Sequence, residues 1–241
     1  MPSVKNAETL VAKLSEIAMR RYSMIEEGDR VLVAVSGGKD SMTLAHDLAM
    51  KRKWWPVRYE MLALHIVTDF APESNQRQLA DLLGSWNIPH VALEVPVIGR
   101  LKEGRAMNCY WCATQRRTEL IRYALAEGFT KIALGHHLDD IVETLFMNML
   151  YKGEMSGMAP MVRYVKYPLA VIRPLALCDE TQIRAFVEEK GFGASTSVCP
   201  YDADSRRKVM RAKLLELTGG SIELKRNIFD SMSHVNPEYL A

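Results

Sequence analysis

No apolar run in the chain approaches the ~20 residues that a membrane-spanning helix needs, which argues against a helical membrane protein. The first residues, Met-Pro-Ser-Val-Lys-Asn-Ala-Glu, lack the charged-then-apolar pattern of a secretory signal. No internal repeat and no low-complexity linker interrupts the 241 residues, so nothing divides the chain into independent domains. We therefore expect one globular cytoplasmic protein without a membrane partner.

A strong charge of either sign is also missing. The 31 Lys and Arg residues nearly balance the 29 Asp and Glu residues, leaving a net charge of +2. Any surface for nucleic acid must then come from local clusters. Two candidates are Lys51-Arg52-Lys53-Trp54-Trp55 and the basic stretch 205–213. Such segments suit an RNA backbone with unstacked bases, although basic runs are most often solvated helix faces.

Cysteine is scarce, with four residues in the chain. In the cytosol these thiols stay reduced, so metal binding or catalysis explains them better than disulfides. Cys109 and Cys112 form a C-x-x-C pair, which allows a redox dithiol, half of a zinc site or two ligands of an iron–sulfur cluster. Cys178 is expected to be a small buried residue at the start of a helix.

A structural zinc site would require four protein ligands. The segment Cys199-Pro200-Tyr201-Asp202 supplies one further thiol in a setting comparable to the C-x-x-C pair. Three cysteines without a fourth ligand are what a [4Fe-4S] cluster with one open iron would require. An open iron can bind sulfide, which would turn an electron carrier into a sulfur donor or a Lewis acid.

The most informative segment is Ser36-Gly37-Gly38-Lys39-Asp40-Ser41, directly after the apolar run 31–35. Two adjacent glycines let the backbone turn tightly and point several N–H groups at one anion. A lysine, two hydroxyls and the N-terminus of a following helix add to this anion site. The Walker spacing Gly-x-x-x-x-Gly-Lys-[Ser/Thr] is absent. The segment therefore predicts a phosphate cradle of another type, in which Asp40 holds Mg²⁺ or orients a reactant.

Alternating strand-like and helix-like segments predict an α/β fold with a parallel sheet covered on both faces. Ligands of such sheets lie beyond the carboxyl ends of the strands, where the loop after the first strand, His65 and Gly135 would meet. Strands are expected at 30–35, 59–67, 90–95, 131–135 and 169–173, and helices at 7–25, 40–52, 75–86, 113–127, 138–151, 179–190, 203–217 and 222–233.

The segment Gly135-His136-His137-Leu138-Asp139-Asp140 ends one strand and opens the next helix. Asp139 occupies a position expected for a helix cap, and Asp140 is a candidate for magnesium or phosphate chemistry. The two histidines could be zinc ligands, but adjacent side chains diverge, which favours a structural or ATP-lining role. Arg116 follows the C-x-x-C pair by about one helical turn and would neutralise phosphate or a developing charge near the thiols.

Together these motifs resemble the tRNA 2-thiocytidine synthetases (TtcA type) of the PP-loop ATP pyrophosphatase superfamily. The resemblance covers nearly the whole chain, including 36–41, the C-x-x-C with Arg116-Arg117, the run 131–151, Gly157-Met158-Ala159-Pro160, 171–175 and 227–230. It implies a Rossmann-like PP-loop fold in one domain, with an N-terminal helix over 1–25, a nucleotide-binding core over 26–175 and a C-terminal helical part over 176–241.

The resemblance also implies an ATP- and Mg²⁺-dependent enzyme, usually a homodimer, that replaces the C2 oxygen of cytidine-32 in tRNA with sulfur. Its sulfur donor would be sulfide or a cysteine desulfurase system. By motif match, Cys109, Cys112 and Cys199 would bind a [4Fe-4S] cluster, and Asp40, Arg116 and Asp140 are candidate catalytic residues. The candidate nucleotide site comprises Ala34, Ser36, Gly37, Gly38, Lys39, Asp40, Ser41, His65, Gly135 and Asp140. One departure is Asp202, which stands where the family commonly has the last cysteine of a second C-x-x-C.

Four alternatives remain open from the sequence. A PP-loop thiolase could act on another tRNA base to make 2-thiouridine, or a sulfur-inserting relative could act on a small cofactor. A ligase of the lysidine or NAD synthetase type would use an amine and need none of the three cysteines. A zinc-stabilised RNA-binding module would contain zinc without iron and would not turn over ATP.

Overall fold

The computed structural model describes residues 7–70, 74–192 and 206–239. In this part of the chain, six strands form one sheet in the order β3-β2-β1-β4-β6-β5. Every neighbouring pair is parallel except β5 with β6, which is antiparallel. The strands are β1 (Asp29–Ala34), β2 (Tyr59–Thr68), β3 (His90–Val95), β4 (Lys131–Ala133), β5 (Met161–Arg163) and β6 (Ala170–Ile172).

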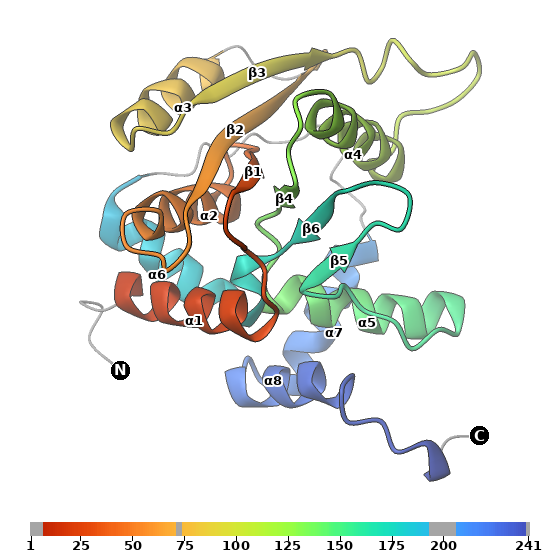
Figure 1. Cartoon of the computed structure of the whole chain (residues 1–241). Helices are drawn as coiled ribbons and strands as arrows, with labels where there is room; N and C mark the ends of the chain where they lie inside the picture. Colours follow the sequence, from red (N-terminus) through yellow and green to blue (C-terminus); the bar gives the residue numbers. More distant parts are fainter. Residues whose placement is uncertain (1–6, 71–73, 193–205, 240–241) are drawn as a thin grey trace.

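Helices cover both faces of the sheet and extend beyond one end of it (Figure 1). The expected α/β architecture is therefore confirmed, and the edge strand β5 is the element that the sequence pattern missed. The helices are α1 (Ala7–Arg21), α2 (Lys39–Lys51), α3 (Ser74–Ser85), α4 (Cys109–Ala126), α5 (Leu138–Lys152), α6 (Glu180–Lys190), α7 (Arg206–Thr218) and α8 (Ile222–Ser231), with 3₁₀ turns at Pro174–Leu177 and Pro237–Tyr239.

Alternation along β1 divides the core between the two faces of the sheet. Val31 and Val33 point into a cluster with apolar side chains of α1, α2, α3 and α6, whereas Leu32 points into a second cluster under α4. A third cluster joins α5 to α7 and α8 beyond the edge of the sheet. The nucleotide loop therefore starts from a strand that is buried on both sides.

The structure contradicts part of the prediction that residues 51–55 form an exposed basic and aromatic surface for RNA. Lys51 is only 1% exposed and pairs with the buried carboxylate of Asp47, which also accepts a 2.6 Å hydrogen bond from the Ser15 hydroxyl. Trp55 packs against the core cluster of α1, α2, α3 and α6. The side chains that remain exposed are those of Arg52, Lys53 and Trp54.

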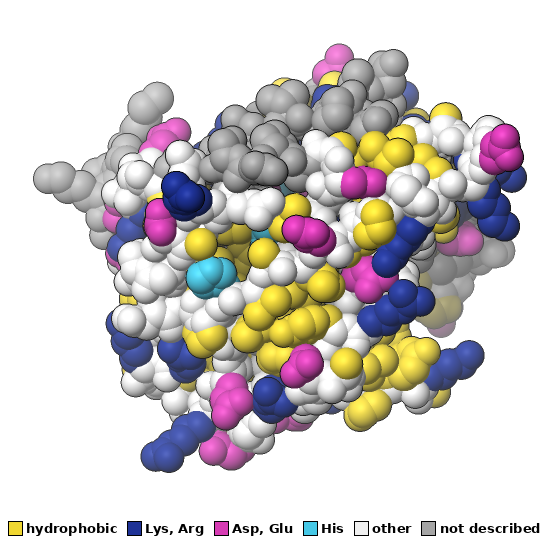
Figure 2. Space-filling view, turned by 90° about the horizontal axis from the view of Figure 1, so that it is seen from above, with side chains coloured by type: hydrophobic (Ala, Val, Ile, Leu, Met, Phe, Trp, Pro, Cys, Tyr) yellow, Lys and Arg dark blue, Asp and Glu magenta, His cyan; other side chains and the backbone are white. Residues whose placement is uncertain are grey.

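One face of the molecule carries charged side chains of both signs, in keeping with the balanced composition. Figure 2 shows positive and negative side chains interspersed around a central group of hydrophobic ones on the face seen from above. Among the described helices, none is long and apolar enough to cross a membrane.

Candidate functional site

The nucleotide loop connects β1 to α2 and presents backbone N–H groups at the start of the helix. Gly37 has a φ of +84°, a left-handed conformation that favours glycine. Gly38 is the N-cap of α2 and offers no side-chain cap, so the first N–H groups of the helix are available to an anion. The Ser36 and Ser41 hydroxyls lie 3.1 Å apart, and Ser41 Oγ accepts a hydrogen bond from the Ser36 N–H. Ala34 ends β1 immediately before this loop.

The charges of the loop are already paired within the protein. Lys39 Nζ lies 2.9 Å from Asp40 Oδ1 and 3.4 Å from Glu180 Oε1 at the start of α6. All three side chains are partly buried. A triphosphate entering the loop would therefore compete with two carboxylates for Lys39.

Gly135 is required for the close packing of β4 against the nucleotide loop. A Cβ atom at this position would lie 2.9 Å from both the Asp40 carbonyl carbon and the Ser41 nitrogen, and 3.0 Å from the Asp40 oxygen. Real Cβ atoms essentially never come within 3.0 Å of such neighbours. The absence of a side chain at Gly135 therefore lets the strand end support the start of α2.

His65 links the nucleotide loop to the cysteine-bearing helix. Its Nδ1 lies 2.8 Å from the Val35 carbonyl oxygen, and because a carbonyl only accepts, Nδ1 carries the proton. Burial lowers the pKa of His65, and the nearby charge of Arg116 on α4 lowers it further, against the opposing hydrogen bond to Val35. His65 is therefore held beside the loop, within range of the charge of Arg116.

The helix α5 begins differently from the expectation that Asp139 caps it. His137 is the N-cap, and its backbone N–H donates to Asp140 Oδ2 at 3.1 Å. Asp139 instead accepts a 2.8 Å hydrogen bond from the Glu180 N–H and pairs with Lys225 of α8 at 2.6 Å. Asp139 lies two residues after the N-cap, and its side chain contacts α6 and α8 instead of capping α5.

His137 is buried between the carboxylates of Asp40, Asp139 and Asp140. Its Nε2 lies 3.6 Å from both Asp40 Oδ1 and Asp140 Oδ2, and its Nδ1 lies 3.4 Å from Asp139 Oδ2. Burial alone would lower the pKa of His137, but the neighbouring carboxylates outweigh burial and raise it. The three acids and this histidine therefore interact with one another, and Asp40 connects them to the nucleotide loop.

His136 has the opposite environment. Burial lowers its pKa to about 4, so the ring is neutral near pH 7. The Arg173 Nε–H lies 3.4 Å from His136 Nδ1, which acts as the acceptor because arginine can only donate. A structural or site-lining role for His136 stays a prediction; among the described residues, no group of three or more His, Cys, Asp or Glu side chains is arranged to hold a metal ion.

The second basic cluster is also partly turned inward. Arg207 Nη1 of α7 lies 3.1 Å from Asp140 Oδ1, and Arg211 Nε lies 2.6 Å from Glu143 Oε1. Burial would raise the pKa of Asp140, but the charges of His137, His136 and Arg207 lower it. These ion pairs were not predicted from the sequence, although the i, i+4 spacing of the arginines and the i, i+3 spacing of the acids place each pair on one helix face.

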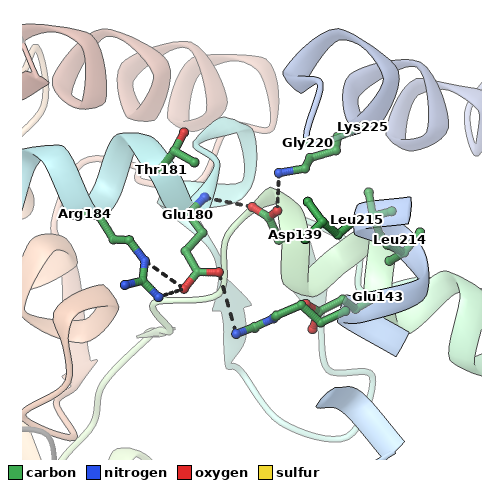
Figure 3. A pocket seen from close by; sticks show the side chains of 11 residues that line it. Asp139, Glu143, Glu180, Thr181, Arg184, Leu214, Leu215, Gly220 and Lys225 are labelled. Atoms are coloured by element: carbon green, nitrogen blue, oxygen red, sulfur yellow. Dashed lines mark hydrogen bonds and ion pairs between the residues drawn. The ribbon is translucent and has the colours of Figure 1, made fainter. Parts of the chain in front are cut away.

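A cavity of about 220 Å³ lies beside this network, between α5, α6, α7 and α8. Figure 3 shows Glu180 and Asp139 pointing into the space between these helices, with ion pairs to Arg184 and Lys225, respectively. Glu180 also pairs with Arg211 at 3.6 Å. Glu143 also lines the cavity, and its buried Oε2 finds no hydrogen-bond partner among the described residues.

Cys109 and Cys112 lie in the first turn of α4, because the helix begins four residues earlier than the expected 113. The Asn108 side chain caps it by accepting a 2.9 Å hydrogen bond from the Trp111 N–H. The i, i+3 spacing places both thiols on one helix face, where Cys109 is exposed and Cys112 half-buried. Cys178 is buried, as expected, but precedes α6 by two residues. Cys199 and Asp202 lie outside the described residues.

Comparisons with known proteins agree with this architecture. A domain family described as PP-loop domain matches residues 6–218. A tRNA-cytidine(32) 2-sulfurtransferase from Alkalilimnicola ehrlichii is 37% identical over 244 residues, covering 97% of this chain and 76% of the relative. One with the same name from Geobacter metallireducens is 36% identical, covering 92% of this chain and 88% of the relative.

Solved structures share the fold at lower sequence identity. The U34-tRNA thiolase NcsA from Methanococcus maripaludis, solved with its [4Fe-4S] cluster, superposes with a TM-score of 0.77 at 20% identity, covering 96% of this chain and 82% of that one. An NMN synthetase from Francisella tularensis reaches a TM-score of 0.53 at 13% identity, covering 97% of this chain and 87% of its own. With the domain match and the curated relatives, the chain belongs to the tRNA 2-thiocytidine synthetase (TtcA-type) family of PP-loop proteins.

Proposed function

We propose that this protein is an ATP-dependent tRNA sulfurtransferase that replaces the C2 oxygen of cytidine-32 with sulfur. The observation that carries the proposal is the convergence at His65. This residue bonds to the nucleotide loop through Val35 and lies in the field of Arg116, one turn after the C-x-x-C pair. This link supports a site in which phosphate and thiol chemistry act together. The curated relatives, named for 2-thiolation of cytidine-32, support the choice of substrate.

In this proposal ATP binds with its phosphates against the N-terminus of α2. The backbone N–H groups after Gly38, the hydroxyls of Ser36 and Ser41, and Lys39 contact the phosphates. Asp40 and Asp140 are the candidate ligands of Mg²⁺, because both carboxylates lie 3.6 Å from the same His137 nitrogen and hard cations prefer oxygen ligands. Bound Mg²⁺ would neutralise charge on the departing pyrophosphate.

The donor set on α4 fits an iron–sulfur cluster as far as the described residues extend. Two cysteines on one face of a capped helix turn, with no carboxylate or histidine completing a third ligand, suit thiolate-rich coordination. Cys199 is the proposed third ligand. When bound, the cluster would supply an iron with an open coordination position for a sulfide or hydrosulfide co-substrate.

The reaction then requires two displacements. The C2 oxygen of the base attacks the α-phosphorus of ATP, forming an adenylated base and releasing pyrophosphate. Sulfide attacks C2, and AMP departs with the former C2 oxygen. The protein residues hold the phosphates through Lys39 and stabilise charge near the base through Arg116. An unpaired anticodon-loop base can reach such a site without disrupting a duplex.

We infer that the protein acts in the cytoplasm as a homodimer, with sulfide or a cysteine desulfurase system as sulfur donor. A PP-loop thiolase that makes 2-thiouridine is the second candidate, since NcsA shares the fold and is named for U34 of tRNA. The two candidates differ in which nucleoside gains sulfur, so nucleoside mass spectrometry separates them.

The test is a reconstituted reaction under anaerobic conditions with ATP, Mg²⁺, sulfide and unmodified tRNA. We expect 2-thiocytidine to form with equimolar AMP and pyrophosphate. Cys112→Ser is expected to abolish product formation and to lower the iron content. Cys178→Ala changes a buried thiol away from the site and should keep the product yield and the iron content of the wild type. A full yield of product from Cys112→Ser protein would contradict the proposal.

A further inference from the structure

A chain of ion pairs connects the nucleotide loop to α7, and Glu180 is its centre. Glu180 Oε1 lies 3.4 Å from Lys39 Nζ and 2.7 Å from Arg184 Nη2. Glu180 Oε2 lies 3.6 Å from Arg211 Nη1 on α7. Arg211 in turn donates through Nε to Glu143 of α5. One carboxylate is thus shared among cations from α2, α6 and α7.

The backbone of Glu180 is held in place, and the three ion pairs of its carboxylate differ in length. Glu180 is the first residue of α6, and its N–H donates to Asp139 Oδ2 at 2.8 Å. The Glu180 side chain is only 16% exposed, so solvent screens its charge weakly. At 3.6 Å, the contact with Arg211 is longer than an ideal charge-assisted hydrogen bond. Loss of one cation would strengthen the interaction with those that remain.

The surroundings leave room for a second arrangement. The cavity of about 220 Å³ is lined by Glu180, Arg211 and Glu143. Within the part of the chain that the structure describes, the buried Glu143 Oε2 makes no hydrogen bond, and Arg207 Nε lies 3.8 Å from it. A network with an unused buried acceptor and adjacent space is not at its tightest packing, so the arginines of α7 can move closer to these acids.

We propose that Glu180 is a positioning residue that couples nucleotide binding to the packing of α7. Phosphates in the loop attract Lys39 away from Glu180, because they carry more negative charge than one carboxylate. Glu180 then binds Arg211 more closely, which draws α7 onto α5 and α6. This inference rests on the proposed function only in that ATP occupies the loop.

The coupling would serve the chemistry because of where α7 lies in the chain. Its first residue, Arg206, comes seven positions after Cys199 (206 − 199), and Arg207 contacts Asp140 of the site. A helix that tightens when ATP binds would order the acid–arginine pairs before the base is adenylated. By linkage, anything that tightens α7 raises nucleotide affinity by the same factor.

The test is hydrogen exchange of the full-length, anaerobically prepared protein, with and without Mg²⁺ and α,β-methylene-ATP. Glu180→Gln removes the charge but keeps the shape, and Glu188→Gln, on an exposed position of the same helix, is the matched control. In the wild type and Glu188→Gln we expect the nucleotide to slow exchange of α7 amides by about fivefold or more. We expect Glu180→Gln to bind the nucleotide, as measured by titration calorimetry, without slower exchange of the α7 amides. Exchange of α3 serves as the reference.

Two results would overturn the proposal: α7 exchange that does not respond in the wild type, or a response in Glu180→Gln equal to that of the wild type. A wild type that binds no analogue would overturn both this inference and the nucleotide site. If Glu180→Gln does not fold, Arg211→Gln removes the next ion pair of the same network and is tested in the same way. The assay contains no tRNA and no sulfide, so a failure of thiolation leaves it interpretable, and a failure of coupling leaves thiolation intact.

Discussion

The substitution Gly135→Ala tests whether the close approach of β4 to the nucleotide loop is required for ATP binding. The added methyl group would lie 2.9 Å from backbone atoms of Asp40 and Ser41. Ordinary contacts begin at 3.4 Å, so the strand end and the start of α2 must separate by about half an ångström. Inserting one carbon into a packed site typically costs about 1–3 kcal/mol.

Asp40 and Ser41 belong to the first turn of α2, and Gly135 lies two residues after β4, so neither backbone can move as freely as a flexible side chain. We therefore expect the free energy of unfolding in urea to fall by about 1–3 kcal/mol. Strain that is relieved by displacing the loop would instead appear as weaker nucleotide binding, by roughly 5- to 150-fold for the same energy. Urea titration and calorimetric titration with α,β-methylene-ATP measure the two parts separately.

Gly84→Ala is the matched control. Gly84 lies near the end of α3, and a Cβ atom there meets nothing within 4 Å, so this variant should be neutral or up to about 1 kcal/mol more stable. If Gly135→Ala matches the wild type in both stability and nucleotide affinity, the argument that the missing side chain supports the loop is wrong.

Three further predictions concern buried polar groups. Lys51→Met should lower the free energy of unfolding by about 3–5 kcal/mol, because it leaves the buried Asp47 without its cation, and urea titration checks this. Cys178→Ala should keep the iron and acid-labile sulfide content of the wild type, whereas Cys112→Ser should lose it, as colorimetric analysis would show. Burial lowers the pKa of His46 to about 4, so the unfolded chain binds the extra proton between about pH 6.5 and 4 and stability falls as the pH falls through this window. His46→Phe should remove up to about 1.4 kcal/mol per pH unit of that slope, and an unchanged slope would refute the assignment.

The sequence predicted the elements that strong local signals define. Apolar runs bounded by polar turns located the central strands β1 and β2 within a residue, since strands buried in a parallel sheet are continuously hydrophobic. The edge strand β3 was located from its alternating pattern, in which every second residue is exposed. The start of α4 was missed by four residues, because its cap is Asn108 and the cysteines that follow carry no helical periodicity. β5 was missed because only three residues pair at the edge of the sheet.

The site was predictable where one segment supplies the chemistry and not where contacts join distant segments. The residues of the loop 36–41 by themselves predict phosphate binding. By contrast, the pairing of Asp140 with Arg207 joins residues 67 positions apart, and the role of Glu180 depends on three helices meeting at one point. No local pattern encodes such contacts, which is why Asp139 was misassigned as a cap and Lys51 as a surface cation.

We propose that this chain inserts sulfur into cytidine-32 of tRNA. The most direct measurement is nucleoside mass spectrometry of tRNA from a strain that lacks the gene, with and without a plasmid that restores it. We expect 2-thiocytidine to disappear on deletion and to return with the wild-type gene but not with Cys112→Ser. Unchanged thionucleosides in the deletion strain would contradict it.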